Sequence, residues 1–194
     1  MSTSDYFQPC GLRDEEGLDY RQREVLSALS EDRNATYSFQ GLRRKLGLHQ
    51  EMLSRTLDRL EEQDLIERTE DGYRIGFEGH APRPGVAGAT LVETRVVAAS
   101  LPHETDPILV LERLKGRWFG EFRWLGYSIT SSNLTMRWIS DDGRIQLRAK
   151  LHRNVLAINA VHSSGIEEER AMRSAFELFE LVTSRTSLMP HAAS

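Results

Sequence analysis

The segment LHQEMLSRTLDRLEEQDLI, from Leu48 to Ile66, combines regularly spaced leucines with side chains that form directional hydrogen bonds. Leu53, Leu57 and Leu60 recur at intervals of four and three residues, which predicts one buried helix face. The other faces hold polar residues, namely Gln50, Glu51, Ser54, Arg55, Asp58, Arg59 and Glu62. Arginine can donate two hydrogen bonds to guanine, glutamine can pair with adenine, and glutamate can accept from cytosine. The segment is therefore either an ordinary helix with a solvated face or one whose polar face meets DNA bases.

The residues on either side of this helix predict the elements that position it. Tyr20 to Leu29 reads as a helix with Asp19 as its N-cap, and ATYSF is a short extended piece. Ser38 can cap a second short helix, which Gly47 would end. After the third helix, LIERT and YRIGF alternate around Asp71-Gly72, a favoured two-residue hairpin turn. The order helix, strand, helix, turn, helix, hairpin is that of a winged helix-turn-helix.

The stretch YSFQGLRRKLGLHQEMLSRTLDRLEEQDLIERTEDGYRI also resembles the DNA-binding core of bacterial and archaeal winged-helix regulators, broadly of the MarR and ArsR kind. The matching positions are Leu42, Leu46, Gly47 and Leu48 at the turn, Ser54, Arg55, Leu57 and Leu60 in the helix, and Leu65-Ile66 before the wing. The resemblance implies a DNA-binding transcriptional regulator. Because the third helix of such folds lies in the major groove, it implies base contacts from Gln50, Glu51, Ser54 and Arg55.

The same resemblance implies contacts to the DNA backbone from residues around that helix. Arg43, Arg44 and Lys45 form a dense basic cluster that suits phosphate anchoring. His49 stands where these regulators usually carry a serine or threonine cap, and the wing tip at Glu70-Asp71 is acidic. The expected backbone contacts are Ser38, Arg43, Arg44, Lys45, His49, Arg59, Arg68 and Arg74. A winged-helix module that binds other proteins in a larger assembly is the alternative interpretation.

Composition limits the kind of partner. The chain has 194 residues and a net charge of −4, which argues against nonspecific coating of nucleic acid. Leu18 to Gly76 holds ten basic and twelve acidic side chains, so any DNA footprint must come from their arrangement. The single cysteine, Cys10, excludes an intramolecular disulfide and a multi-cysteine metal site. Without a signal peptide or an apolar run of about 20 residues, we expect a cytoplasmic protein with no membrane partner.

A stretch without periodicity divides the chain. GFEGHAPRPGVAGAT, from Gly76 to Thr90, holds four glycines and two prolines, the composition of a domain boundary. We expect a flexible tail at residues 1–17, a winged helix at 18–77, a linker at 78–89 and a second domain at 90–188. The second domain would bind an effector or form the dimer.

The second half predicts the order strand, helix, four strands, helix. Its first helix begins at the Asp106 cap with Pro107 as its first residue. Its last helix, about residues 167–184, is expected to be buried through Met172, Ala175, Phe176, Phe179 and Val182. One antiparallel sheet with both helices on one face is the simplest arrangement. The fold class is therefore α+β, a winged helix followed by an antiparallel-sheet domain of order βαββββα.

The hairpin WISDDGRIQL fixes one register in that sheet. With Asp142-Gly143 as the turn, Arg137 lies opposite Arg148, and Lys150 shares their face. Two arginines that face each other repel unless an anion or a carboxylate lies between them. The face could hold a small anionic effector, with Trp124 nearby in sequence. It could also pair with Glu93, Glu121 or a partner subunit, or touch nucleic acid.

The sequence contains no pattern that names a reaction. Its six histidines show no metal-ligand spacing, and it has neither a nucleophile elbow nor a glycine-rich phosphate loop. We therefore expect a regulator with no catalytic residues, no metal and no cofactor. A homodimer is expected because two-fold half-sites on DNA usually require one, with apolar residues of the first or last helix as the interface.

Overall fold

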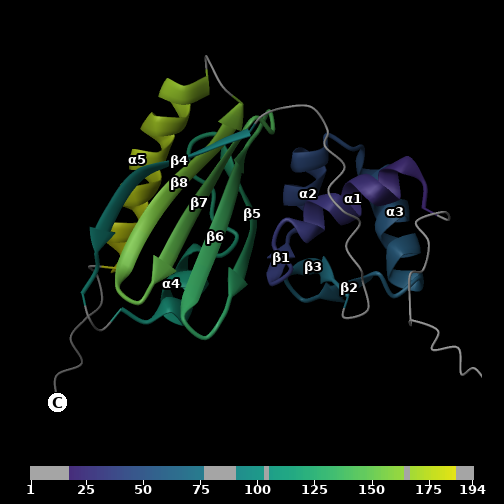
Figure 1. The fold of residues 1–194 in the computed structure, drawn as a ribbon, viewed down its shortest axis with the longest axis horizontal. Helices are drawn as coiled ribbons and strands as arrows, with labels where there is room; N and C mark the ends of the chain where they lie inside the picture. Colours follow the sequence, from purple (N-terminus) through teal and green to yellow (C-terminus); the bar gives the residue numbers. More distant parts are fainter. Residues whose placement is uncertain (1–17, 77–90, 103–104, 164–166, 187–194) are drawn as a thin grey trace, which may run out of the picture.

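The computed structural model describes residues 18–76, 91–102, 105–163 and 167–186 (Figure 1). The predicted tail, residues 1–17, and the predicted linker, residues 78–89, lie outside the described residues. The first half contains α1 (Tyr20–Ser30), β1 (Ala35–Tyr37), α2 (Phe39–Leu46), α3 (Gln50–Glu62), β2 (Ile66–Thr69) and β3 (Gly72–Ile75). The second half contains β4 (Leu91–Ser100), α4 (Pro107–Leu114), β5 (Phe122–Ile129), β6 (Asn133–Ser140), β7 (Ile145–His152), β8 (Val155–Ser163) and α5 (Glu167–Thr186).

The first half is a winged helix, as its sequence predicts. Asp19 and Gln22 form a reciprocal capping box at the start of α1, and Ser38 caps α2. Gly47 ends α2 in the left-handed conformation, with φ of 62°, and lets the chain turn directly into α3. The wing turn differs by one residue from the prediction. Because Thr69 pairs with Gly72, the two turn residues are Glu70 and Asp71.

The second half has the predicted order βαββββα and the predicted antiparallel pairing. The register of β6 and β7 is confirmed, with Arg137 opposite Arg148 and Met136 opposite Ala149. The helices α4 and α5 cover one face of these strands, over a core that includes the buried side chains of Trp138, Phe122, Met136, Leu147 and Leu178.

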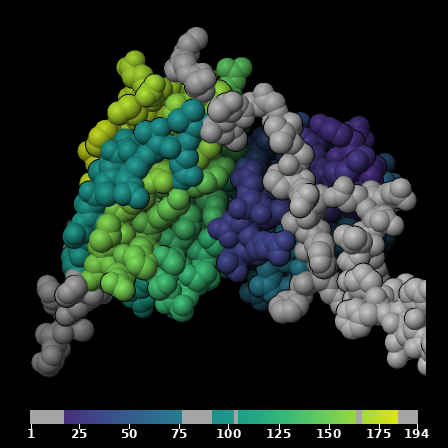
Figure 2. All heavy atoms as spheres, viewed as in Figure 1, coloured from purple at the N-terminus to yellow at the C-terminus, as the bar shows by residue number. Residues whose placement is uncertain are grey.

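The two halves share one sheet, a connection that the sequence does not predict. The strand order is β2-β3-β1-β5-β6-β7-β8-β4, and β1 pairs with both β3 and β5. Close approach makes this junction possible: a Cβ at Gly126 would lie 2.1 Å from the Thr36 carbonyl oxygen, and one at Gly41 would lie 2.6 Å from Leu125 Cα. The winged helix therefore sits directly against the second half (Figure 2).

Leu125 and Ile139 show how the junction is packed. Both belong to strands of the second half, yet both are buried in the core of the winged helix together with Tyr37, Leu42 and Leu57. A bulge between Trp124 and Gly126 turns Leu125 to that face. The sheet therefore carries one apolar core under α4 and α5 and a second one under the winged helix.

The last helix is rotated relative to the sequence prediction. Its fully buried side chains are Ala171, Ala175, Leu178 and Val182. Met172 and Phe176, which were predicted to be buried, are 41% and 47% exposed, so that part of the prediction is wrong. The small residues Ala171 and Ala175 let α5 lie close to the sheet, which leaves the two larger side chains on its flank. Among the described helices, none is long and apolar enough to cross a membrane.

Candidate nucleic-acid interface

The N-terminal half of α3 directs its polar side chains away from the protein. Leu53, Leu57 and Leu60 are fully buried, so helical geometry places Glu51 and Arg55 on the outer side. Their side chains are 68% and 72% exposed, and Arg55 Nη2 donates to Glu51 Oε1 at 2.5 Å. An exposed pair one helical turn apart contributes well under about 1 kcal/mol. Arg55 can therefore exchange Glu51 for another acceptor at little cost.

An open hollow lies where α2 turns into α3. It is lined by Arg43, Gly47, Leu48, His49, Gln50, Glu51 and Ser54. His49 is the N-cap of α3, but its side chain makes no capping hydrogen bond. The first amides of α3 therefore receive no hydrogen-bond acceptor from the His49 side chain, and Arg43 lines the same hollow. Backbone amides at a helix start together with a cation favour an anion such as a phosphate.

The three basic side chains of α2, Arg43, Arg44 and Lys45, do not point the same way: one lines the hollow and two contact the second half. Arg43 lines the hollow, whereas Arg44 Nε lies 3.5 Å from Asp141 in the turn between β6 and β7. Lys45 Nζ lies 2.9 Å from Glu31 and also donates to Gln146 on β7. Burial lowers the pKa of Lys45, and Glu31 opposes this effect. Two of the three expected phosphate anchors thus contact the protein itself.

Ser38 is also used within the fold. Its hydroxyl accepts from Gly41 N and donates to the Trp124 carbonyl, at 3.1 Å in each case. The structure therefore gives Ser38 a capping role in α2 and a docking role against β5. The cause is the β1–β5 junction, which brings the start of α2 against β5.

The acidic tip of the wing is held by the second half. Asp71 forms an ion pair with Lys115 at the end of α4 and accepts a hydrogen bond of 2.8 Å from the Tyr127 hydroxyl. Burial and the hydrogen bond to Asp71 raise the pKa of Tyr127 to about 12, so this phenol keeps its proton. Asp71 at the wing tip is therefore used to hold the wing against the second half.

The remaining expected backbone contacts lie on the outer surface of the winged helix. Arg68 lies over the Tyr73 ring at 5.6 Å, and Arg74 donates to Glu67 at 2.7 Å. Arg59 lies 3.7 Å from Asp19. The pairs that involve Arg74 and Arg59 are exposed and therefore weak, so both guanidinium groups remain available for exchange.

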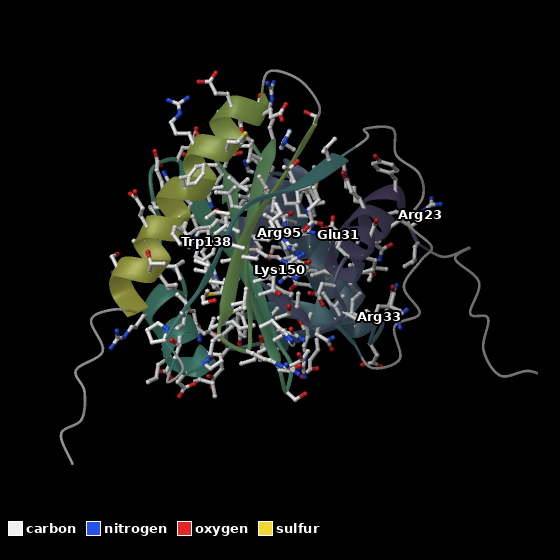
Figure 3. All side chains as sticks on the ribbon, turned by 60° about the vertical axis from the view of Figure 1, so that its left-hand side comes forward. Arg23, Glu31, Arg33, Arg95, Trp138 and Lys150 are labelled. Carbon is white, nitrogen blue, oxygen red and sulfur yellow. The ribbon has the colours of Figure 1, made fainter. Side chains whose placement is uncertain are left out.

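The basic side chains on the sheet face of Arg137 form ion pairs with carboxylates of the protein. Arg137 pairs with Asp32, in the loop between α1 and β1. Arg148 and Lys150 both donate to Glu93 on β4, at 3.2 and 2.8 Å, as one of the open interpretations required. Figure 3 shows Glu31 and Lys150 where the winged helix meets this face.

Trp124 does not belong to that face. It is buried in the core under α4 and α5, where its ring meets Trp138 edge to face at 5.2 Å. Trp124 pairs with the core residue Trp138 and therefore shares its face, whereas proximity in sequence does not reveal which side of a strand a residue occupies.

Sequence reasoning missed the residues that join the two halves. Glu31, Asp32, Lys115 and Tyr127 carry contacts across more than 40 positions of sequence, and no local pattern marks them. One sequence signal was available: the predicted register sets Arg137 opposite Arg148 without a carboxylate in the same hairpin, and such a crowded charge requires a carboxylate from elsewhere.

Comparison with known families supports the interpretation of the first half. Residues 18–72 match the MarR family, a region that spans α1 to the start of the wing's second strand. This match confirms the resemblance seen in the sequence: the first half is a winged-helix domain of the kind found in MarR transcriptional regulators. The match does not extend into the second half. A comparison with curated proteins finds no match to the chain.

Proposed function

We propose that the protein is a sequence-specific DNA-binding transcriptional regulator whose α3 enters the major groove. The observation that carries the proposal is the exposed polar half of α3 beside an open hollow at the helix-turn-helix. Gln50, Glu51, Ser54 and Arg55 are the proposed base contacts. Arg55 has the most specific chemistry, because its guanidinium matches the O6 and N7 acceptors of guanine.

The proposed backbone contacts are fewer than the sequence suggested. Arg43 and His49 border the hollow, and Arg59, Arg68 and Arg74 lie on the outer surface of the winged helix. Ser38, Arg44 and Lys45 are left out because their polar atoms contact the second half. Because fewer cations face DNA, the affinity for DNA should fall less steeply with salt concentration than it would if all three α2 cations bound phosphates.

The second half, in this proposal, forms the dimer and holds the winged helix rigidly. One winged helix reads only a few base pairs, and a two-fold dimer doubles the site. An anionic effector on the Arg137 face is not part of the proposal, because Asp32 and Glu93 already neutralise that face.

Selection of binding sites from a random DNA library, followed by fluorescence anisotropy at several salt concentrations, tests the proposal. Arg55→Ala should weaken specific binding by about 1–3 kcal/mol and relax the preference at one base pair. Arg173→Ala removes the same charge from α5 and serves as the matched control, expected to leave affinity unchanged. An Arg55→Ala protein with unchanged affinity and sequence preference would contradict a role for α3 in base reading.

The alternative is that the winged helix binds another protein. Two observations favour it: the wing tip and two α2 cations are held by the protein itself, and residues 18–76 carry a net charge of −2. Absence of any DNA shift at low salt, where electrostatic binding is strongest, would support this alternative.

A further inference from the structure

The strand β4 forms an edge of the sheet at the end opposite the winged helix (Figure 1). It is ten residues long and pairs with β8 on one side, and among the described residues no strand pairs with its other side. Within the part of the chain that the structure describes, its outward backbone N–H and C=O groups thus have no strand partner. Long open edges of this kind are sites of strand addition unless something covers or blocks them.

The flank of α5 next to this edge carries two exposed apolar side chains, Met172 and Phe176. Arg170 points toward β5 and β6, because it binds Glu121 and Asp142. At about 100° per residue, Met172 and Phe176 lie on the opposite flank of the helix, which is the β4 side. Phe176 is 47% exposed, and Val92 of β4 is exposed as well. Figure 2 shows β4 in teal beside α5 in yellow-green, at the end away from the winged helix.

If two copies of β4 pair with each other, their charged side chains attract in one antiparallel register. Glu93 and Arg95 lie on the sheet face opposite α5, because they pair with Val161 and Asn159. If two copies of β4 run antiparallel with Thr94 opposite Thr94, then Glu93 of each copy faces Arg95 of the other. Val92 then faces Val96 on the α5 side. Neighbouring registers with the same hydrogen-bonding geometry place Glu93 opposite Glu93 or Arg95 opposite Arg95, which is unfavourable.

We propose that a second copy of this chain docks here, by antiparallel pairing of β4 with β4 about a two-fold axis at Thr94. Val92, Met172 and Phe176 supply the apolar part of the interface, and the two Glu93–Arg95 pairs fix the register. A carboxylate has about four lone-pair sites, and Glu93 uses three of them for Arg148, Lys150 and Asn159, which leaves one for the incoming arginine.

The length of the pairing is limited by a bulge. The β4–β8 register shifts between Arg95 and Val97, so Val96 is the extra residue. Regular pairing is therefore confined to Glu93–Arg95, with Val92 facing the bulge residue Val96 at either end. The α5 flank must supply the rest of the interface, which makes Phe176 the residue whose loss should matter most. The inference rests on the proposed function only in that a two-fold DNA site calls for a dimer.

Disulfide trapping tests the register directly. In a Cys10→Ser background, Thr94→Cys places two thiols opposite each other across the axis, within the range of a disulfide. Mild oxidation of the full chain should then give a covalent dimer on a non-reducing gel. Ser100→Cys in the same background is the control, because two such residues would lie about 40 Å apart. No cross-link from Thr94→Cys, or equal cross-linking from both, overturns the register.

Sedimentation velocity tests whether the α5 flank with Phe176 belongs to the dimer interface. The wild-type chain should be a dimer, and Phe176→Lys should raise the dimer dissociation constant at least tenfold without lowering the melting temperature. Ile108→Lys changes an exposed apolar residue on α4 and should leave the dimer intact. A monomeric wild type, or a Phe176→Lys protein that dimerises normally, overturns the proposal.

DNA binding separates this inference from the proposed function. Phe176→Lys should lose affinity for a site with two half-sites while its affinity for a single half-site is unchanged. Cross-linking at Thr94 without any DNA binding would refute the regulatory function and leave the interface standing. Specific DNA binding by a chain that neither cross-links nor dimerises would refute the β4 interface and leave the regulatory function standing.

Discussion

Arg137 on β6 and Asp32, in the loop between α1 and β1, form an ion pair where the winged helix meets the second half. Arg137 is 4% exposed, and its guanidinium also donates to Ser128 Oγ at 3.3 Å. The Ser128 hydroxyl in turn donates to Asp32 at 2.8 Å. These three side chains satisfy one another, so the arginine that faces Arg148 across the hairpin is neutralised from the other half of the chain.

Arg137→Met should destabilise the protein by about 3 kcal/mol, because it leaves the Asp32 carboxylate at the junction without its cation. Urea unfolding followed by circular dichroism measures this change. Arg74→Ala breaks an exposed pair with Glu67 and should cost less than about 1 kcal/mol. Equal effects of the two substitutions would contradict a special role for the Arg137–Asp32 pair.

Gly126→Ala should loosen the junction of β1 and β5. A methyl group at this position would lie 2.1 Å from the Thr36 carbonyl oxygen, which is backbone and cannot move aside alone. We expect a loss of about 2–3 kcal/mol in a thermal melt, typical of overpacking. Gly116→Ala is the control: its φ of 72° adds strain, but its methyl group meets no atom within 4 Å, so about 1 kcal/mol is expected. A smaller effect at Gly126 than at Gly116 would argue against tight pairing.

Arg148→Gln should lower the stability of the free protein by about 1 kcal/mol, and no anion should restore it. Arg148 donates to Glu93 at 3.2 Å, so its loss removes a partly exposed pair instead of relieving repulsion between arginines. Thermal melts of wild type and variant with phosphates, nucleotides and carboxylates measure both effects. An anion that raises the melting temperature of the wild type alone would instead show an effector site on this face.

Arg43→Ala should weaken DNA binding to all sequences alike and lower the slope of log affinity against log salt by about one. Lys45→Ala should leave that slope unchanged, because Lys45 lies against Glu31 and Gln146 rather than the hollow. Anisotropy titrations at four salt concentrations distinguish the two. A change in slope for Lys45→Ala as large as that for Arg43→Ala would show that α2 presents both cations to DNA.

Asp142 should contribute to acid sensitivity. Burial raises its pKa, but hydrogen bonds from Ser140 and Arg170 and the Arg170 charge lower it more, so that the pKa falls to about 2 from 3.8. A group with a lowered folded pKa stabilises the protein above its unfolded pKa, and this stabilisation disappears as pH falls through the folded value. Stability should therefore decline between about pH 4 and pH 2. Asp142→Asn should flatten the curve in that window, and an unchanged curve would exclude this carboxylate as a contributor.

The sequence by itself determined the local elements and much of the pairing. Asp19, Ser38, Gly47 and Asp106 mark helix ends because capping and left-handed turns depend on adjacent residues. A turn at Asp142-Gly143 predicted the correct β6–β7 register because side chains alternate with a period of two, although the observed connection is the four-residue loop from Asp141 to Arg144. The winged helix and its family match follow from the same short-range patterns.

Only the tertiary structure decided how these elements meet. The types of Arg44, Lys45 and Asp71 are the same whether these side chains face DNA or a neighbouring strand. In the structure all three contact the second half, which the β1–β5 pairing brings beside them. Likewise, the 3.6-residue period allowed α5 to bury Met172 and Phe176, but close packing through Ala171 and Ala175 left them exposed. Contacts between residues far apart in the chain depend on shape and charge at a junction, which periodicity does not encode.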